Sequence, residues 1–330
     1  MGAILSSAPF IFPLFAVLLA GSWLLSRHVG LALLVTLPCL AAVALPGFAG
    51  GILPGYLIAN VLALNASRGE ARAPLIWPAA CALIFVVVPV ALINWRIGAL
   101  IAGVGLMSGA FVMLGASVMP RGEGFIAASN RARESWQRLF DRLALLAQTR
   151  WGWSLSGVAA VLAALGWFGL RLHLRPIEVG VVAIQLALFF VVTRDWRRGL
   201  AAIFACVPLA LFAVWIAAPA RDSQFLWPLV LVLGTTMIAL QSGTASVFLR
   251  RGDDMATASV RALERIGPAL VLVTAIAAAL FAVLAPAHVA TPLAMLAMGA
   301  GVLLFEPAFA GAIENVFPRK AAIEARYRLG

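Results

Sequence analysis

The sequence predicts an all-α polytopic membrane protein with about eleven transmembrane helices. The first reason is composition, because 63% of the 330 residues are hydrophobic and only 11% are charged. Soluble domains contain roughly 45–50% apolar and about 25% charged residues. The second reason is that the charged residues cluster and leave long uncharged stretches between them. This composition excludes soluble enzymes and nucleic-acid-binding proteins.

A membrane-spanning helix needs roughly 20 mostly apolar residues, and eleven segments of the chain meet this requirement. They are 8–26, 29–46, 49–66, 74–94, 97–119, 153–171, 177–193, 199–218, 226–249, 267–286 and 291–317. The segments divide the chain into a first five-span repeat (1–120), a cytoplasmic amphipathic linker (121–152), a linking transmembrane helix (153–176), and a second five-span repeat with a basic cytoplasmic tail (177–330).

The distribution of basic residues predicts the orientation, because cytoplasmic loops carry an excess of Lys and Arg. With the N-terminus outside, nearly all of the 24 basic residues fall in cytoplasmic loops, and Arg198 is among them. The outer loops hold Arg96, Arg171, Arg175 and Arg221. We therefore expect an N-out, C-in multi-pass protein of the bacterial inner membrane, in which the net charge of +11 is mostly cytoplasmic loop charge.

Two parts of the chain are similar when the sequence is compared with itself at an offset of 198 residues. Residues 118–121 (VMPR) and 316–319 (VFPR) end the fifth and the last predicted span, and Gly103 falls on Gly301 at the same offset. The first five spans are thus predicted to be a diverged copy of the last five. One linking span between them restores the orientation, so the two repeats are expected to be parallel.

The second repeat resembles a membrane half of the RND superfamily, in particular the lipid and hydrophobe exporters of the MMPL and hopanoid type. In residues 226–286 an apolar helix leads into a short basic helix and then into a helix that begins G-x-A and contains a threonine, at Gly267, Ala269 and Thr274. The resemblance is best over residues 177–320. It implies a permease-like membrane core that moves or handles a hydrophobic or lipidic substrate.

Two features depart from that family. The external porter domains are missing, since only residues 172–176 separate the sixth and seventh predicted spans. The stretches that match the family's proton-relay helix read GTTM at 234–237 and GYLI at 55–58, without an acid. We therefore expect the family's proton relay to be absent.

Glu306 is the one acid near the middle of a predicted span, directly before Pro307. A charged group inside the membrane is costly, so it is a candidate functional site, and a proline frees a helix carbonyl. Two interpretations remain open: a protonatable or headgroup-binding carboxylate, and a protonated glutamate bonded to a neighbouring helix.

Other polar side chains in the spans are candidates for contact with the substrate or with protons. They are Thr235, Thr236, Gln241, Ser242, Thr244 and Ser246 in the ninth span, and Asn60 and Asn65 in the third. They could line a polar cleft, and interhelical hydrogen bonding explains them equally well. The glycines of Gly105-x-x-x-Gly109 and of Ala297-x-x-x-Gly301 are expected to allow close helix packing.

Two cytoplasmic stretches are predicted to be helices that do not cross. In 129–147 the apolar residues recur at helical spacing, which suits either a helix on the inner leaflet or a solvated linker helix. The second stretch, 253–266, begins with Asp253 and Asp254, residue types suited to a helix N-terminus. We expect this stretch to end before the span that begins at 267.

The sequence does not favour an enzyme. It has no HExxH, G-x-S-x-G or P-loop motif, and Asp253 and Asp254 have no second acidic cluster with which to hold Mg²⁺ on a phosphate. Cys39, Cys81 and Cys206 lie in apolar runs, which does not suit a metal site or a disulfide framework. We expect no cofactor, no metal and no nucleic-acid partner.

Two functional hypotheses follow. The first is an inner-membrane permease that acts on a lipid-like substrate in the bilayer and delivers it to a separate periplasmic or membrane protein partner. The alternative is a non-transporting membrane subunit, scaffold or assembly factor of a larger complex, since such a protein would also lack relay acids and external domains.

Overall fold

The computed structural model of the chain is all-helical over the residues it describes, and these contain no strand. The structure describes residues 2–26, 28–43, 49–67, 73–93, 95–118, 176–217, 226–284 and 290–318, and short pieces between 137 and 164. Three described helices are long and apolar enough to cross a membrane: Val232–Arg250, Thr257–Val283 and Ala290–Val316. The predicted helical membrane protein is confirmed at this level.

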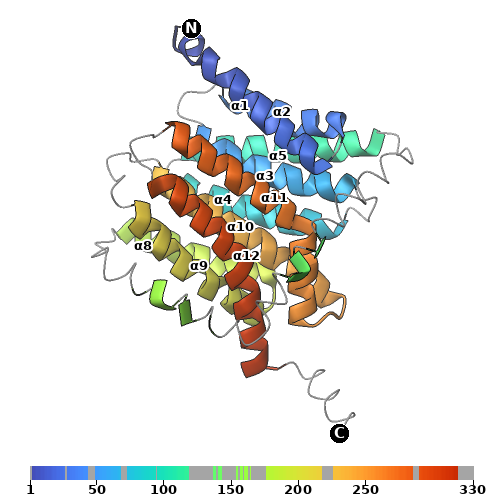
Figure 1. Ribbon diagram of the computed structural model, residues 1–330, viewed down its shortest axis with the longest axis vertical. Helices are drawn as coiled ribbons and strands as arrows, with labels where there is room; N and C mark the ends of the chain where they lie inside the picture. The colour runs from blue at the N-terminus through green and yellow to red at the C-terminus, as the bar shows by residue number, and fades with distance from the viewer. Residues whose placement is uncertain are drawn as a thin grey trace.

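Ten long helices make up the described structure (Figure 1). They are α1 (Gly2–Ser26), α2 (Val29–Val43), α3 (Ala49–Ser67), α4 (Ala73–Ile93), α5 (Trp95–Val118), α8 (Pro176–Thr193), α9 (Trp196–Ala217), α10 (Leu226–Arg250), α11 (Met255–Leu284) and α12 (Ala290–Val316). Each overlaps one of the predicted apolar segments, and α11 also includes most of the stretch 253–266, which was predicted not to cross. The remaining predicted segment, 153–171, lies mostly outside the described residues.

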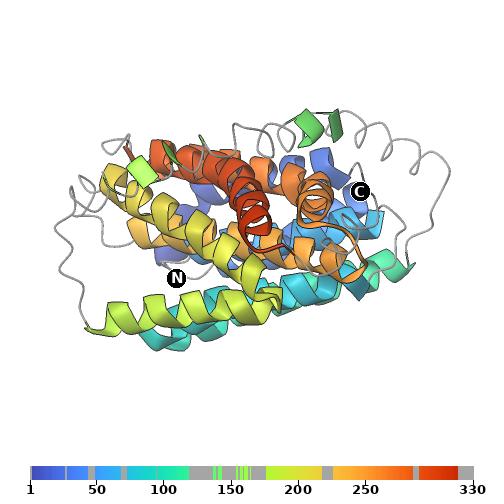
Figure 2. The same cartoon turned by 90° about the horizontal axis from the view of Figure 1, so that it is seen from below.

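The helices form two groups that pack against each other. Within α1–α5, helix α5 packs against α2, α3 and α4; within α8–α12, helix α12 packs against α9, α10 and α11. The groups meet where α3 contacts α10 and α11, where α4 contacts α10 and α8, and where α1 contacts α11. Figure 2 shows α8 running beside the helices of the first group along one face. Helix α10 therefore lies at the centre of the molecule.

The break predicted between 253–266 and the following span is wrong, because α11 is one continuous helix that contains Pro268. A proline removes one helix hydrogen bond. Here the residues on both sides of it, Ile266 and Ala269, are completely buried, and their packing holds the helix together. The predicted N-terminal cap is confirmed for Asp254, whose Oδ1 accepts a hydrogen bond from the backbone N–H of Thr257.

The predicted close-packing glycines are confirmed at two positions. A Cβ at Gly301 would clash with Leu209 of α9, and a Cβ at Gly105 would clash with Leu83 of α4. At Gly109 the same test gives only an ordinary contact with Leu62, at 3.5 Å. Helix α12 can approach α9 so closely because residue 301 has no side chain.

The described part of the linker, residues 137–138 and 140–142, packs against α11. Phe140 is completely buried, and its ring fills the space that a Cβ at Gly267 would need. Arg138 and Arg142 are exposed. The predicted apolar face is therefore turned toward the protein at Phe140, rather than toward a lipid leaflet or solvent, and the rest of 129–147 lies outside the described residues.

Candidate functional site

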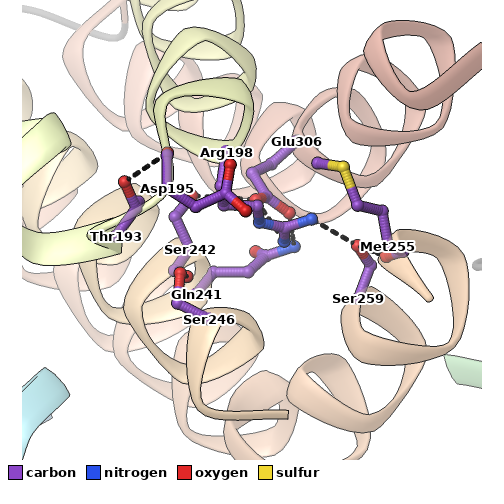
Figure 3. A network of polar contacts seen from close by, with 9 residues as sticks. All are labelled: Thr193, Asp195, Arg198, Gln241, Ser242, Ser246, Met255, Ser259 and Glu306. Carbon is purple, nitrogen blue, oxygen red and sulfur yellow. Dashed lines mark hydrogen bonds and ion pairs between the residues drawn. The ribbon is translucent and has the colours of Figure 1, made fainter. Parts of the chain in front are cut away.

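Glu306 lies at the centre of a buried polar network (Figure 3). Its Oε1 accepts a hydrogen bond of 2.8 Å from Ser242 Oγ, and its Oε2 accepts one of 3.0 Å from Gln241 Nε2. The Nη2 of Arg198 forms an ion pair with Oε1. The carboxylate thus has bonded neighbours from α9 and α10, while its own helix is α12.

Arg198 extends the network to a fourth helix. It is the third residue of α9, and its side chain is 0% exposed, like that of Glu306. Its Nη1 donates a hydrogen bond of 2.7 Å to Ser259 Oγ in α11, and that hydroxyl lies 2.8 Å from the carbonyl oxygen of Met255. Four helices therefore meet at one buried pair of opposite charges.

A sharp turn between α8 and α9 places Arg198 here. Arg194 has a left-handed backbone with φ of 51°, which reverses the chain within two residues. The Asp195 Oδ1 then accepts a hydrogen bond of 3.0 Å from the N–H of Arg197, which caps the start of α9. The chain thus turns back just before Arg198, whose side chain enters the protein from the first helical turn.

Small apolar residues surround the network. Ala201, Ala245 and Ala310 are completely buried, and each follows a network residue of its own helix within four positions. They belong to an apolar cluster that also contains Phe248 and Ile313. Because this shell excludes water, the attraction between the guanidinium and the carboxylate is much stronger than at a surface. The guanidinium of Arg198 stays protonated, and Glu306 is its ion-pair partner within this shell.

The structure brings together some of the predicted site residues and separates others. Gln241 and Glu306 are direct partners. Thr235 and Thr236 lie earlier on α10, and each hydroxyl bonds the carbonyl oxygen of Val232 in its own helix, at 3.1 and 2.6 Å.

The two predicted asparagines lie on α3 in the first helix group. Asn60 donates a hydrogen bond of 2.9 Å to the carbonyl oxygen of Tyr56, and the Tyr56 hydroxyl bonds the carbonyl oxygen of Leu18 in α1. The Asn65 side chain is outside the described part of the structure. Asn60 thus belongs to the contact between α1 and α3, away from the residues that bond Glu306.

Two network residues, Arg198 and Ser259, were missed from the sequence, whereas Ser242 was among the polar residues of the ninth predicted span and bonds Glu306. Arg198 was assigned to a cytoplasmic loop, and this assignment is wrong because α9 begins at Trp196 and the side chain is buried. Glu306 itself indicated that a basic partner exists, since a charge inside a membrane helix needs a partner. The sequence could not choose among Arg194, Arg197 and Arg198. Ser259 gave no signal that distinguished it from other serines.

Among the described residues, no group of three His, Cys, Asp or Glu side chains could hold a metal ion. Comparison with protein-family models, with curated proteins and with solved structures gave no match. The buried network and the arrangement of the helices are therefore the basis for assigning a function.

Proposed function

We propose that the protein is a permease-like bacterial inner-membrane protein, with an RND-type membrane core that moves or handles a hydrophobic or lipidic substrate. The observation that carries this proposal is the buried network around Arg198 and Glu306. Charged side chains within membrane helices are costly, and where they occur they usually mark a substrate or ion pathway. The chain keeps such a pair buried where α9, α10, α11 and α12 meet.

The pattern of helix contacts supports the proposed internal repeat. When α1–α5 are matched in order with α8–α12, each pair of helices in contact has a counterpart. The contact of α2 with α5 matches that of α9 with α12, and the contact of α4 with α10 matches that of α11 with α3. Among the described helices, α3 and α10 are counterparts that contact each other. Two parallel repeats around an axis between α3 and α10 would have this pattern.

Several contacts bring the loops with many arginines to one end of the bundle. The Trp77 indole N–H at the start of α4 bonds the carbonyl oxygen of Val192 at the end of α8. Arg197 bonds the carbonyl oxygen of Pro318 after α12, and Glu314 of α12 accepts a hydrogen bond from the N–H of Met255 at the start of α11. This agrees with the proposed N-out, C-in topology, in which these segments are all cytoplasmic.

The role of the network in this proposal is to set the position of the second repeat. Arg198 and Glu306 join α9 to α12, and Gln241 and Ser242 join α12 to α10, which also contacts the first repeat. A change in this network would move α12 and α9 relative to α10. A substrate would be admitted or released by such a movement.

One observation favours the alternative function, a non-transporting membrane subunit, scaffold or assembly factor. Both oxygens of Glu306 are bonded, and the charges of Arg198 and Glu306 cancel. A network of this kind can also fix one conformation of four helices and do nothing more. A scaffold would use that rigidity to present a fixed surface to a partner.

Reconstitution into liposomes tests the proposal. The purified protein should accelerate the movement of a fluorescent phospholipid between leaflets, and Glu306→Gln should slow this movement at least about tenfold. The matched control is Arg261→Gln, which breaks the exposed ion pair with Asp253. If the protein moves no lipid, and if cells that carry Glu306→Gln do not differ from cells with the wild-type protein, the transport proposal fails. Stoichiometric co-purification of another chain in mild detergent would then favour the scaffold.

A further inference from the structure

The Glu306 carboxylate is held by three donors from two other helices. Arg198 Nη2 reaches it from α9, and Ser242 Oγ and Gln241 Nε2 reach it from α10. One cation and two neutral donors around a single carboxylate are the groups that an anion-binding site presents. We call Arg198, Gln241 and Ser242 the anion cage, and Glu306 comes to it from a different helix, α12.

We infer that the anion cage is a binding site for the acid group of an amphiphilic substrate, and that Glu306 occupies this site in the absence of substrate. The ligand has a carboxylate or a phosphate at the end of a long apolar chain. This inference rests on the proposed function, because it names the class of substrate that the permease would take.

Charge balance makes Glu306 and the ligand exclude each other. The cage carries one positive charge, and Glu306 neutralises it within a shell of buried alanines. A second anion at Arg198 would leave an uncompensated negative charge away from water, which is strongly unfavourable. Glu306 must therefore leave the cage when the acid group of a ligand enters it.

Helix α12 has a point of weakness at the position that this exchange requires. Pro307 follows Glu306 directly and lacks an N–H, so it cannot bond the carbonyl oxygen one turn earlier, at Leu303. Helices bend most readily at such positions. A bend at Pro307 would withdraw Glu306 from Arg198 while both halves of α12 stay helical.

The helices that carry the cage also reach the apolar surface of the protein. The contact between α9 and α12 reaches the outside of the protein at Phe204, which is 50% exposed and stacks on Phe309 at 5.9 Å between ring centroids. Phe309 lies three residues after Glu306 on α12. This contact is closed in the structure, so an amphiphile whose acid group is at Arg198 would extend its chain along it into the bilayer only after a bend at Pro307 has separated the two helices.

Chemical rescue tests the inference directly. In Glu306→Ala the cage remains and its carboxylate is gone, so sodium acetate or inorganic phosphate should raise the Tm of the detergent-solubilised protein by about 5 °C over chloride at equal ionic strength. The more effective anion tells whether the natural acid group is a carboxylate or a phosphate. The matched control is Arg198→Met/Glu306→Ala, in which neither anion should have an effect. Absence of rescue, or equal rescue in the control, overturns the inference.

If Glu306→Ala does not fold, a second measurement on the wild type tests the same inference. Dodecanoate or dodecyl phosphate should stabilise the wild type more than dodecanol does, and this difference should vanish in Arg198→Met/Glu306→Gln. Equal effects of the acids and the alcohol on the wild type would overturn the inference. Lipid movement without any anion effect would support the proposed function and contradict the anion-binding role of the cage. An anion effect without lipid movement would support anion binding by the cage and contradict the proposed transport.

Discussion

Arg198→Met removes the positive charge beside Glu306, and we predict that it destabilises the protein by about 3–5 kcal/mol. The carboxylate then stays buried with two neutral donors, Gln241 and Ser242, and no cation. Both members of the pair are 0% exposed, so solvent cannot replace the lost partner. Methionine fills much of the space of the arginine side chain, so the effect reports charge more than volume.

The double variant Arg198→Met/Glu306→Gln should be much less affected than either single charge removal. It leaves no uncompensated charge, and glutamine keeps the shape of the side chain that bonds Ser242 and Gln241. We expect its stability to be within about 1–2 kcal/mol of that of the wild type, because neutral replacement of a buried pair is often nearly neutral. Such non-additivity is the signature of a direct interaction.

A thiol-reactive dye measures this effect in detergent. Cys39, Cys81 and Cys206 are free and buried, so the dye reacts as the protein unfolds. The predicted loss for Arg198→Met corresponds to roughly 4–7 °C in Tm for a chain of 330 residues. The control is Arg261→Gln at the exposed pair with Asp253, where the cost should be below about 1 kcal/mol.

The reasoning about the buried pair is refuted by either of two results. Arg198→Met could lower the Tm no more than Arg261→Gln does, or the double variant could lose as much stability as the sum of its single changes. The first result would mean that water reaches Glu306, and the second would mean that the two charges do not interact.

Three further predictions concern other parts of the structure. Gly301→Ala should lower the free energy of unfolding by about 1–3 kcal/mol, because its Cβ clashes with a side chain of α9. Gly311→Ala has open space around it and should be neutral or stabilising. Thermal unfolding of the two variants compares them. Tyr56→Phe removes the hydroxyl that bonds the carbonyl oxygen of Leu18 at 2.6 Å and should cost about 1 kcal/mol by the same measurement, and an unchanged Tm would contradict the role of this bond between α1 and α3. A cysteine at the exposed Arg251 should react with a membrane-impermeant maleimide in inverted but not in right-side-out vesicles; labelling only in right-side-out vesicles would reverse the proposed topology.

The helices could be predicted from the sequence because their main determinant is local. A run of apolar residues of sufficient length forms a helix in a membrane protein whatever it packs against. The cap at Asp254 and the close approach at Gly301 were also predictable, since each depends on one residue type at one position. The continuity of α11 was missed because it depends on packing around Pro268, which the sequence does not display.

The candidate site could be predicted only by half. Glu306 was found because an acid in an apolar segment is conspicuous, and Gln241 because it is polar in a buried helix. Arg198 was missed because the charge pattern at the start of α9 is the pattern of a cytoplasmic loop. Its burial follows from the tight turn at Arg194 and from the partner 108 residues later in the chain. Such a long-range pairing leaves no periodicity that a single sequence can show.

Lipid movement by the stable double variant tests the central claim most directly. Arg198→Met/Glu306→Gln is expected to keep the fold and to lose the exchangeable charge pair, so it separates a role in function from a role in stability. In liposomes it should move fluorescent phospholipid at least about tenfold more slowly than the wild type, with an unchanged helix content by circular dichroism. Movement at the wild-type rate would contradict the account, because the network would then only hold the helices together and have no role in lipid movement.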